Sequence, residues 1–162
     1  MSPSKGMPPV IVWSLIVILS LADQITKLLT LRFIPYQETI PVIPGTFSLT
    51  HLHNTGAAFS MLHDNNRFFI ILSTMVLIAL VFLRRHFSGL LMQWGWLLLI
   101  SGIIGNVSDR IRLGYVVDFL DFQFGSYHWP AFNVADSCIC IAAGLFLISG
   151  FITPKETNQN IT

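Results

Sequence analysis

Long, mainly apolar stretches separated by polar segments dominate the chain. Each stretch is long enough to cross a bilayer as a helix, or nearly so with arginines at its ends. They are residues 10–31, 68–83, 87–108 and 131–152. The pattern predicts an all-α membrane protein in which residues 1–162 form a single integral membrane domain with four transmembrane helices. The polar segments, about residues 32–66 and 110–130, then lie on one side of the membrane.

The composition agrees with this class. The 162 residues are 53% hydrophobic and only 10% charged, with a mean hydropathy of +0.68. Soluble domains carry about 25% charged residues. The net charge of +1 and the absence of a basic patch argue against a nucleic-acid partner. Cys138 and Cys140 are spaced i, i+2 within an apolar helix, which disfavours both a disulfide and a thiol-redox site.

The first apolar stretch has two interpretations. Lys5, the apolar residues 10–21 and the small residues around Ala22 resemble a cleavable signal peptide. Asp23 and Lys27, however, are spaced i, i+4 in the order that favours an ion pair on a helix. We therefore expect the helix to continue past residue 22, with Asp23 and Lys27 forming a partly buried pair.

Two polar segments show the alternation of β-strands. Residues 46–53 and 120–124 alternate polar and apolar side chains. His51 and His53 fall on one face of the first strand and could ligate a metal, but no third ligand follows at metal spacing. We therefore predict a solvated face for the two histidines and no metal site.

Small and polar residues recur along one face of the third apolar stretch. Gly102, Gly105, Asn106 and Asp109 are spaced i, i+3, i+4 and i+7. Such a face in a lipid-buried helix predicts packing against other helices, because small residues let backbones approach closely.

Asp118 and Asp136 lie just before and just inside the last apolar stretch. A carboxylate near hydrocarbon is costly and is often functional. Two that converge can share a proton, so that one acts as base and the other as acid. In the alternative interpretation, Asp118 lies in a solvated loop and Asp136 caps a helix or pairs with a cation. A non-enzymatic transporter subunit, with Asp23, Asp109 and Asp136 along an ion pathway, is the other class of function.

Five short motifs, in this order along nearly the whole chain, resemble those of the lipoprotein signal peptidases (signal peptidase II). They are Asp23-Gln24-Ile25-Thr26-Lys27, Asn54-Thr55-Gly56-Ala57-Ala58-Phe59, Gly102-Ile103-Ile104-Gly105-Asn106-Val107-Ser108-Asp109-Arg110, Val117-Asp118-Phe119 and Phe132-Asn133-Val134-Ala135-Asp136. Ser101 departs from the family pattern, in which two glycines often open the third motif. Serine is also small, so the third motif still matches the family pattern.

The resemblance implies an aspartic intramembrane endopeptidase without cofactor or metal. It implies Asp118 and Asp136 as the catalytic pair, and a small extracytoplasmic β-sheet cradle that agrees with the alternating segments. The substrates would be diacylglyceryl-modified prolipoproteins, cut just before the lipid-modified cysteine by a monomer among membrane lipid. Residues with implied supporting or substrate-binding roles are Asp23, Lys27, Asn54, Gly56, Asn106, Asp109, Arg110, Asn133 and Ala135.

The resemblance also implies the bacterial cytoplasmic (inner) membrane. We place both termini in the cytoplasm because Arg84 and Arg85 lie in the shortest loop, on the side of the termini, where positive charge counts most. Lysines and arginines also favour this side by four to three, when Lys27 and Arg110 are left out of the count because they look engaged with Asp23 and Asp109. The active site then faces the extracytoplasmic side.

Overall fold

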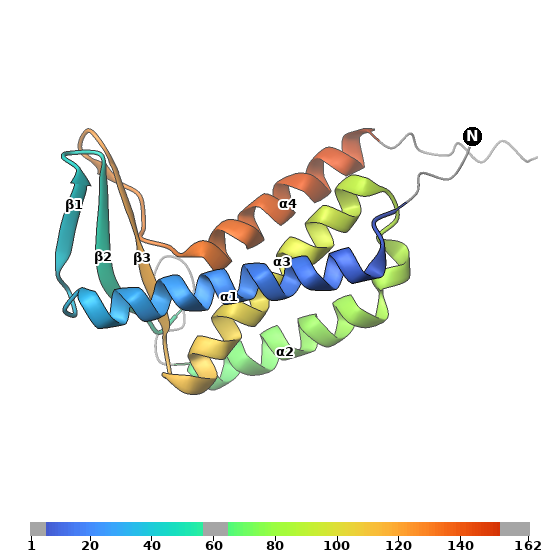
Figure 1. Cartoon of the computed structure of the whole chain (residues 1–162), viewed down its shortest axis with the longest axis horizontal. Helices are drawn as coiled ribbons and strands as arrows, with labels where there is room; N and C mark the ends of the chain where they lie inside the picture. Colours follow the sequence, from blue (N-terminus) through green and yellow to red (C-terminus); the bar gives the residue numbers. More distant parts are fainter. Residues whose placement is uncertain (1–5, 57–64, 153–162) are drawn as a thin grey trace, which may run out of the picture.

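A computed structural model describes residues 6–56 and 65–152, which form a helical bundle with a small sheet at one end (Figure 1). The helices are α1 (Pro9–Phe33), α2 (Asn66–Phe82), α3 (Leu90–Arg112) and α4 (Val134–Ile152), with a 3-10 turn η2 (Arg84–His86). The strands are β1 (Thr39–Ile43), β2 (Phe47–Asn54), β3 (Val116–Phe124) and β4 (Tyr127–His128).

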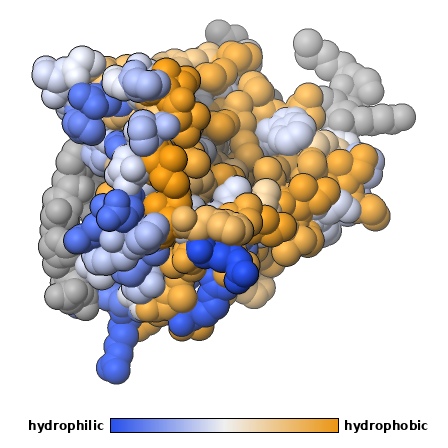
Figure 2. All heavy atoms as spheres, turned by 60° about the vertical axis from the view of Figure 1, so that its left-hand side comes forward, coloured by the Kyte–Doolittle hydropathy of each residue, from blue (hydrophilic) through white to orange (hydrophobic). Residues whose placement is uncertain are grey.

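Three helices, α1, α3 and α4, are long and apolar enough to cross a membrane. Helix α2 is equally apolar but has only 17 residues. Many large apolar side chains point outward from the helices, and hydrophobic residues cover broad areas of the surface (Figure 2). Outward apolar side chains need a lipid environment, so this surface agrees with a membrane protein.

The helix limits differ from the apolar stretches by a few residues. α1 runs without a break through Ala22, as the spacing of Asp23 and Lys27 predicts. α3 begins at Leu90 rather than residue 87, because η2 occupies residues 84–86 and Gly89 has a φ of 84°, which ends one helix before the next begins.

Helix α3 is the centre of the bundle and contacts the other three helices. Its apolar side packs with α1 and α2 in a core that includes Trp96, Leu97 and Val12. Its small residues face α4. A Cβ at Gly102 would lie 2.5 Å from the backbone oxygen of Ala135, so the close approach of α3 and α4 requires glycine there. The predicted small-residue face is confirmed.

The strands form an antiparallel sheet in the order β1-β2-β3-β4. The strand expected at residues 46–53 is β2, and residues 120–124 are the second half of the longer β3. Asp118 therefore lies on a strand, opposite Leu52, and not in a solvated loop. β1 was not expected. Pro41 interrupts its alternation, and it is the edge strand of the sheet, where proline is tolerated.

Candidate active site

Asp118 is a buried carboxylate held by two amide side chains. Its side chain is 4% exposed. Asn54 Nδ2 donates a hydrogen bond to one oxygen at 3.0 Å, and Asn133 Nδ2 donates to the other at 2.7 Å. The Asn54 amide is itself oriented, because its oxygen accepts a hydrogen bond from the backbone N–H of Gly56. Strand β2 thus brings Asn54 to Asp118, 64 residues away in sequence.

Asp136 is fixed by the first turn of α4. Its backbone N–H donates to Asn133 Oδ1 at 2.9 Å, while the Asn133 N–H donates back to Asp136 Oδ2 at 3.3 Å. This is the reciprocal arrangement of a capping box, with Asn133 as the cap. Asn106 Nδ2 adds a 2.7 Å hydrogen bond from α3 to Asp136 Oδ1. A negative charge is stabilised at this position by the helix N-terminus.

Asn133 therefore binds both carboxylates, one through its side chain and one through its backbone. The two groups are close enough to interact electrostatically. The pKa of Asp118 is raised to about 7, mainly by burial and to a lesser extent by the negative charge of Asp136. A carboxyl with this pKa can exchange a proton at neutral pH, which is what general acid–base chemistry requires.

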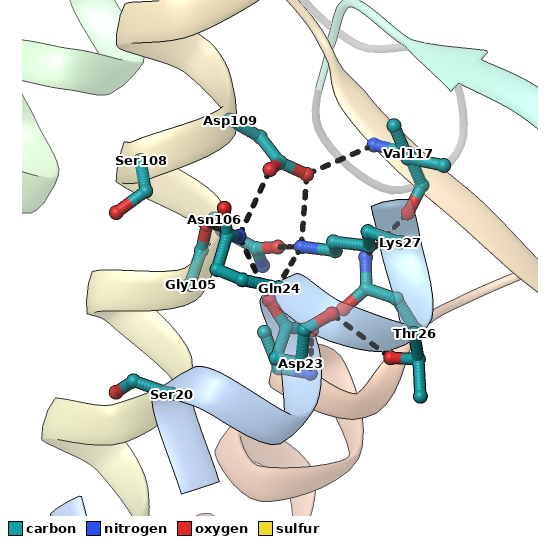
Figure 3. Close-up of polar contacts among 12 residues, drawn as sticks. Ser20, Asp23, Gln24, Thr26, Lys27, Gly105, Asn106, Ser108, Asp109 and Val117 are labelled. Atoms are coloured by element: carbon teal, nitrogen blue, oxygen red, sulfur yellow. Dashed lines mark hydrogen bonds and ion pairs between the residues drawn. The ribbon is translucent and has the colours of Figure 1, made fainter. Parts of the chain in front are cut away.

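A buried charge network lies beside the pair (Figure 3). Lys27 Nζ lies 2.9 Å from Asp23 Oδ2 and 3.0 Å from Asp109 Oδ2, and donates to Asn106 Oδ1 at 3.0 Å. The expected pair of Asp23 and Lys27 is confirmed, but it is fully buried rather than partly buried. Because Lys27 binds the oxygen of Asn106, the amide nitrogen of Asn106 must face Asp136.

Asp23 also connects α1 to the start of α4. Its Oδ1 accepts a 2.8 Å hydrogen bond from the backbone N–H of Ala135, one of the unpaired donors of the α4 N-terminus. A Cβ at Gly105 would lie 2.5 Å from Asp23 Oδ2 and 3.0 Å from the Ala135 side chain. Glycine at this position therefore allows α1, α3 and α4 to converge behind Asp136.

The charge count assumed that Arg110 pairs with Asp109, and the structure shows that it does not. It donates to the carbonyl of Gly56 at 3.2 Å and lies over the Phe69 ring, 5.0 Å from its centroid. Arg112 lies instead against Asp109, at 3.5 Å. Neighbours at i, i+1 on a helix point in different directions, whereas i, i+3 neighbours meet. Arg110 thus supports the backbone just after Asn54. The rest of that motif, residues 57–59, lies outside the described residues.

The prediction of a solvated face for the histidines was wrong. His51 is only 5% exposed; its Nδ1 lies 2.8 Å from the Ile34 carbonyl oxygen, and its Nε2 lies 3.0 Å from His53 Nε2. Tyr36 and Tyr115 stack on the two faces of His53. Burial and the neighbouring His51 lower the pKa of His53. In the described part of the chain, no group of three or more His, Cys, Asp or Glu side chains is arranged to hold a metal ion.

Two further residues of the network were not predicted. Gln24 Nε2 donates to Asp109 Oδ1 at 3.0 Å and to the Gly105 carbonyl at 3.2 Å, and Arg112 covers Asp109 from the outside. Gln24 lies between Asp23 and Lys27 in the first motif, which is the sequence signal that could have identified it. Arg112 had no such signal.

Comparisons with known proteins identify relatives along most of the chain. Residues 15–152 match the family model described as signal peptidase (SPase) II. The lipoprotein signal peptidase of Geobacter sulfurreducens is 47% identical over 131 residues, which cover 78% of this chain and 82% of the relative. That of Janthinobacterium sp. (strain Marseille) is 41% identical over 152 residues, 90% of each chain.

Two solved structures share the fold. Both are described as bacterial membrane enzyme structures determined by the in meso method. The first is 30% identical, with a TM-score of 0.87, and covers 100% of this chain and 99% of the other. The second is 33% identical, with a TM-score of 0.81, and covers 90% of this chain and 96% of the other.

Proposed function

This chain belongs to the signal peptidase II family of multi-pass proteases of the bacterial inner membrane, and we propose that it removes the signal peptide of diacylglyceryl-modified prolipoproteins by aspartic catalysis. Asp118 and Asp136 are its catalytic pair. The observation that carries the proposal is the arrangement around Asn133, which binds the buried carboxylate of Asp118 and the half-buried carboxylate of Asp136.

The two aspartates take different roles. Asp136 receives hydrogen bonds from Asn106 and from the Asn133 backbone, and lies in the first turn of α4, so a negative charge is favoured there. It is the general base that takes a proton from water. Asp118, with its pKa raised to about 7 by burial and by Asp136, holds the proton at rest and is the general acid.

The reaction then needs only these two groups. Asp136 removes a proton from a water molecule, and the resulting hydroxide attacks the carbonyl carbon of the scissile peptide bond. Asp118 supplies the proton that the leaving amine needs, and the bond breaks. The amides of Asn54, Asn106 and Asn133 hold both carboxylates in place. Lys27 fixes the orientation of Asn106 and acts as a positioning residue.

The sheet gives the pair its surroundings. β2 and β3 carry Asn54 and Asp118, and the sheet lies at the end of the bundle where α1 ends and α4 begins (Figure 1). We place this end on the extracytoplasmic side and both termini in the cytoplasm, with α2 as the fourth span of a single membrane domain. Arg84 and Arg85 support this orientation, since basic residues of short loops favour the cytoplasm.

Selectivity comes from the lipid of the substrate. Each buried CH₂ contributes about 0.8 kcal/mol, so an acyl chain supplies a large share of the binding energy. The test is cleavage of paired precursors, with and without the diacylglyceryl group, by the purified monomer in detergent. The proposal predicts that the modified precursor is cut and the unmodified one very poorly. Equal rates would show that the peptide alone is recognised.

A further inference from the structure

At the end of the bundle opposite the sheet, α1 begins and α2 leads through η2 into α3 (Figure 1). A cavity of about 240 Å³ opens there between the start of α1, η2 and the first turns of α3. Cationic and polar side chains line one part of it: Arg84, Arg85, Ser88 and Gln93. Apolar side chains line the rest: Met7, Pro9, Val12, Phe87 and the buried Trp96. The catalytic residues proposed above do not line it.

Arg84 is held in this cavity with unused hydrogen-bonding capacity. Its guanidinium carbon lies 5.2 Å from the centroid of the Trp96 ring, and that ring is fixed by a 2.8 Å hydrogen bond from Trp96 Nε1 to the Leu80 carbonyl. Arg84 Nε is buried, yet no hydrogen-bond partner lies within reach of it in the described part of the chain. A buried donor left unpaired is costly, so an acceptor from outside the chain would stabilise it.

Among the described residues, the two arginines of the cavity have no acidic partner. Within residues 6–56 and 65–152, neither Arg84 nor Arg85 forms an ion pair with a carboxylate. The described acidic residues lie on the strands, beside them, or in the parts of α1, α3 and α4 nearer the sheet: Asp23, Glu38, Asp109, Asp118, Asp121 and Asp136. The cavity therefore attracts an anion, and an arginine pair suits a phosphate in particular.

An apolar groove of about 330 Å³ lies beside the cavity, between α1, α2 and α3. Trp13 lines the groove and meets Trp96, which lines the cavity, edge to face at 5.8 Å. Phe82 at the end of α2 also lines the groove and precedes Arg84 by two residues. The groove exposes only apolar side chains: Leu77, Ile78, Val81, Ile100 and Ile104 in addition to Trp13 and Phe82.

We propose that this end of the bundle is a binding site for an anionic phospholipid, with the phosphate in the arginine cavity and an acyl chain in the adjoining groove. A basic pocket between membrane helices is the arrangement that recognises anionic headgroups. The adjacent groove favours a lipid over free phosphate, because only a lipid fills both parts. The site is distinct from the aspartate pair and does not depend on the reaction catalysed there.

The test is thermal unfolding of delipidated protein in detergent, titrated with phosphatidylglycerol. A ligand that binds only the folded state raises Tm in a concentration-dependent manner. We expect a saturable rise with phosphatidylglycerol, and a much smaller one with phosphatidylcholine of the same acyl chains or with inorganic phosphate. R84Q/R85Q should move the midpoint of the titration about tenfold or more to higher lipid concentration.

Two further variants separate the parts of the site. R67Q removes an exposed arginine at the opposite end of α2 and should titrate like the parent. Ile78→Trp fills the groove. It should weaken the binding of phosphatidylglycerol, seen as a smaller rise in Tm, and should not create a response to inorganic phosphate. R84K, which keeps the charge and loses the planar group, should fall between the parent and R84Q/R85Q.

Cleavage of the lipid-modified precursor at parent rates in each variant controls for folding. Equal midpoints for R84Q/R85Q and R67Q would overturn the proposal. An equal response to phosphatidylcholine would overturn the role of the arginines. A response to inorganic phosphate as large as that to phosphatidylglycerol would overturn the lipid assignment.

Discussion

The ammonium of Lys27 on α1 lies 3.0 Å from the carboxylate of Asp109 on α3, and both side chains are fully buried. Asp23 shares the same ammonium, so one cation faces two carboxylates in the interior of the bundle. Hydrogen bonds from Gln24 and from the backbone N–H of Val117 supply part of the remaining compensation at Asp109. The network therefore joins α1, α3 and β3 next to the aspartate pair.

Lys27→Met should strongly destabilise the protein. It removes the buried cation shared by Asp23 and Asp109 and leaves only the half-exposed Arg112 beside Asp109. Breaking a buried pair typically costs about 3–5 kcal/mol. Arg112→Met is the matched control, because Arg112 touches the same Asp109 but is 43% exposed. Exposed pairs contribute about 1 kcal/mol or less. Thermal unfolding in one detergent compares the two; equal losses of Tm would mean that the buried network contributes little.

Gly105→Ala should separate the helices behind Asp136. The new methyl would meet the Asp23 carboxylate and the Ala135 side chain, and overpacking of this kind costs about 1–3 kcal/mol. Gly144→Ala in α4 is the control, since a Cβ there meets nothing within 4 Å. We expect G105A to lower both Tm and the cleavage rate, and G144A to leave both near the parent. A parent-like G105A would show that this close approach is not needed.

Cleavage should decline as the pH rises through about 7. Burial and Asp136 raise the pKa of Asp118 to about 7, so the pair keeps one proton below that pH and loses it above. The folded state also binds this proton more tightly than the unfolded state does. Its stabilising contribution is therefore complete below the ordinary pKa of aspartate and is lost as the pH rises toward 7.

Profiles of kcat/KM and of Tm against pH measure both effects, with Asp118→Asn as the control for stability. Asp118→Asn should remove the part of the Tm profile that belongs to this group. A cleavage rate that stays constant through and well above neutral pH would argue against a proton held by Asp118.

Exhaustive chelation should leave the cleavage rate unchanged, because His51 and His53 are engaged with each other and with the Ile34 carbonyl. His53→Gln should likewise retain activity. Both are measured on the lipid-modified precursor. Loss of activity with a chelator, recovered by zinc, would instead make the two histidines part of a metal site.

The sequence predicted the elements that depend on local pattern. The spacing of Gly102, Gly105, Asn106 and Asp109 was enough to identify the packed face of α3, because helical periodicity alone decides which side chains share a face. The spacing of Asp23 and Lys27 predicted their ion pair for the same reason. It could not predict full burial, which depends on Asp109 from another helix.

The misses concern contacts between distant segments. The histidine pair is covered by Tyr36 and Tyr115, which flank the sheet from different parts of the chain, so strand alternation alone predicted the wrong environment. β1 escaped prediction because edge pairing with β2, and not its own pattern, makes it a strand. Likewise, the capping box that orients Asp136 is local, but its joint contact with Asp118 requires β3 to pass beside α4.

The most direct test of the account is cleavage of a diacylglyceryl-modified precursor by the purified parent protein, Asp118→Asn and Asp136→Asn. Each substitution keeps the size of the side chain and removes its acid–base function. Both variants should insert and fold, with a cooperative thermal transition. Each should lose about a thousandfold or more in rate, nearly as much as the double variant, because the two groups act as a unit. Activity near the parent level in either folded single variant would contradict the assignment of Asp118 and Asp136 as the catalytic pair.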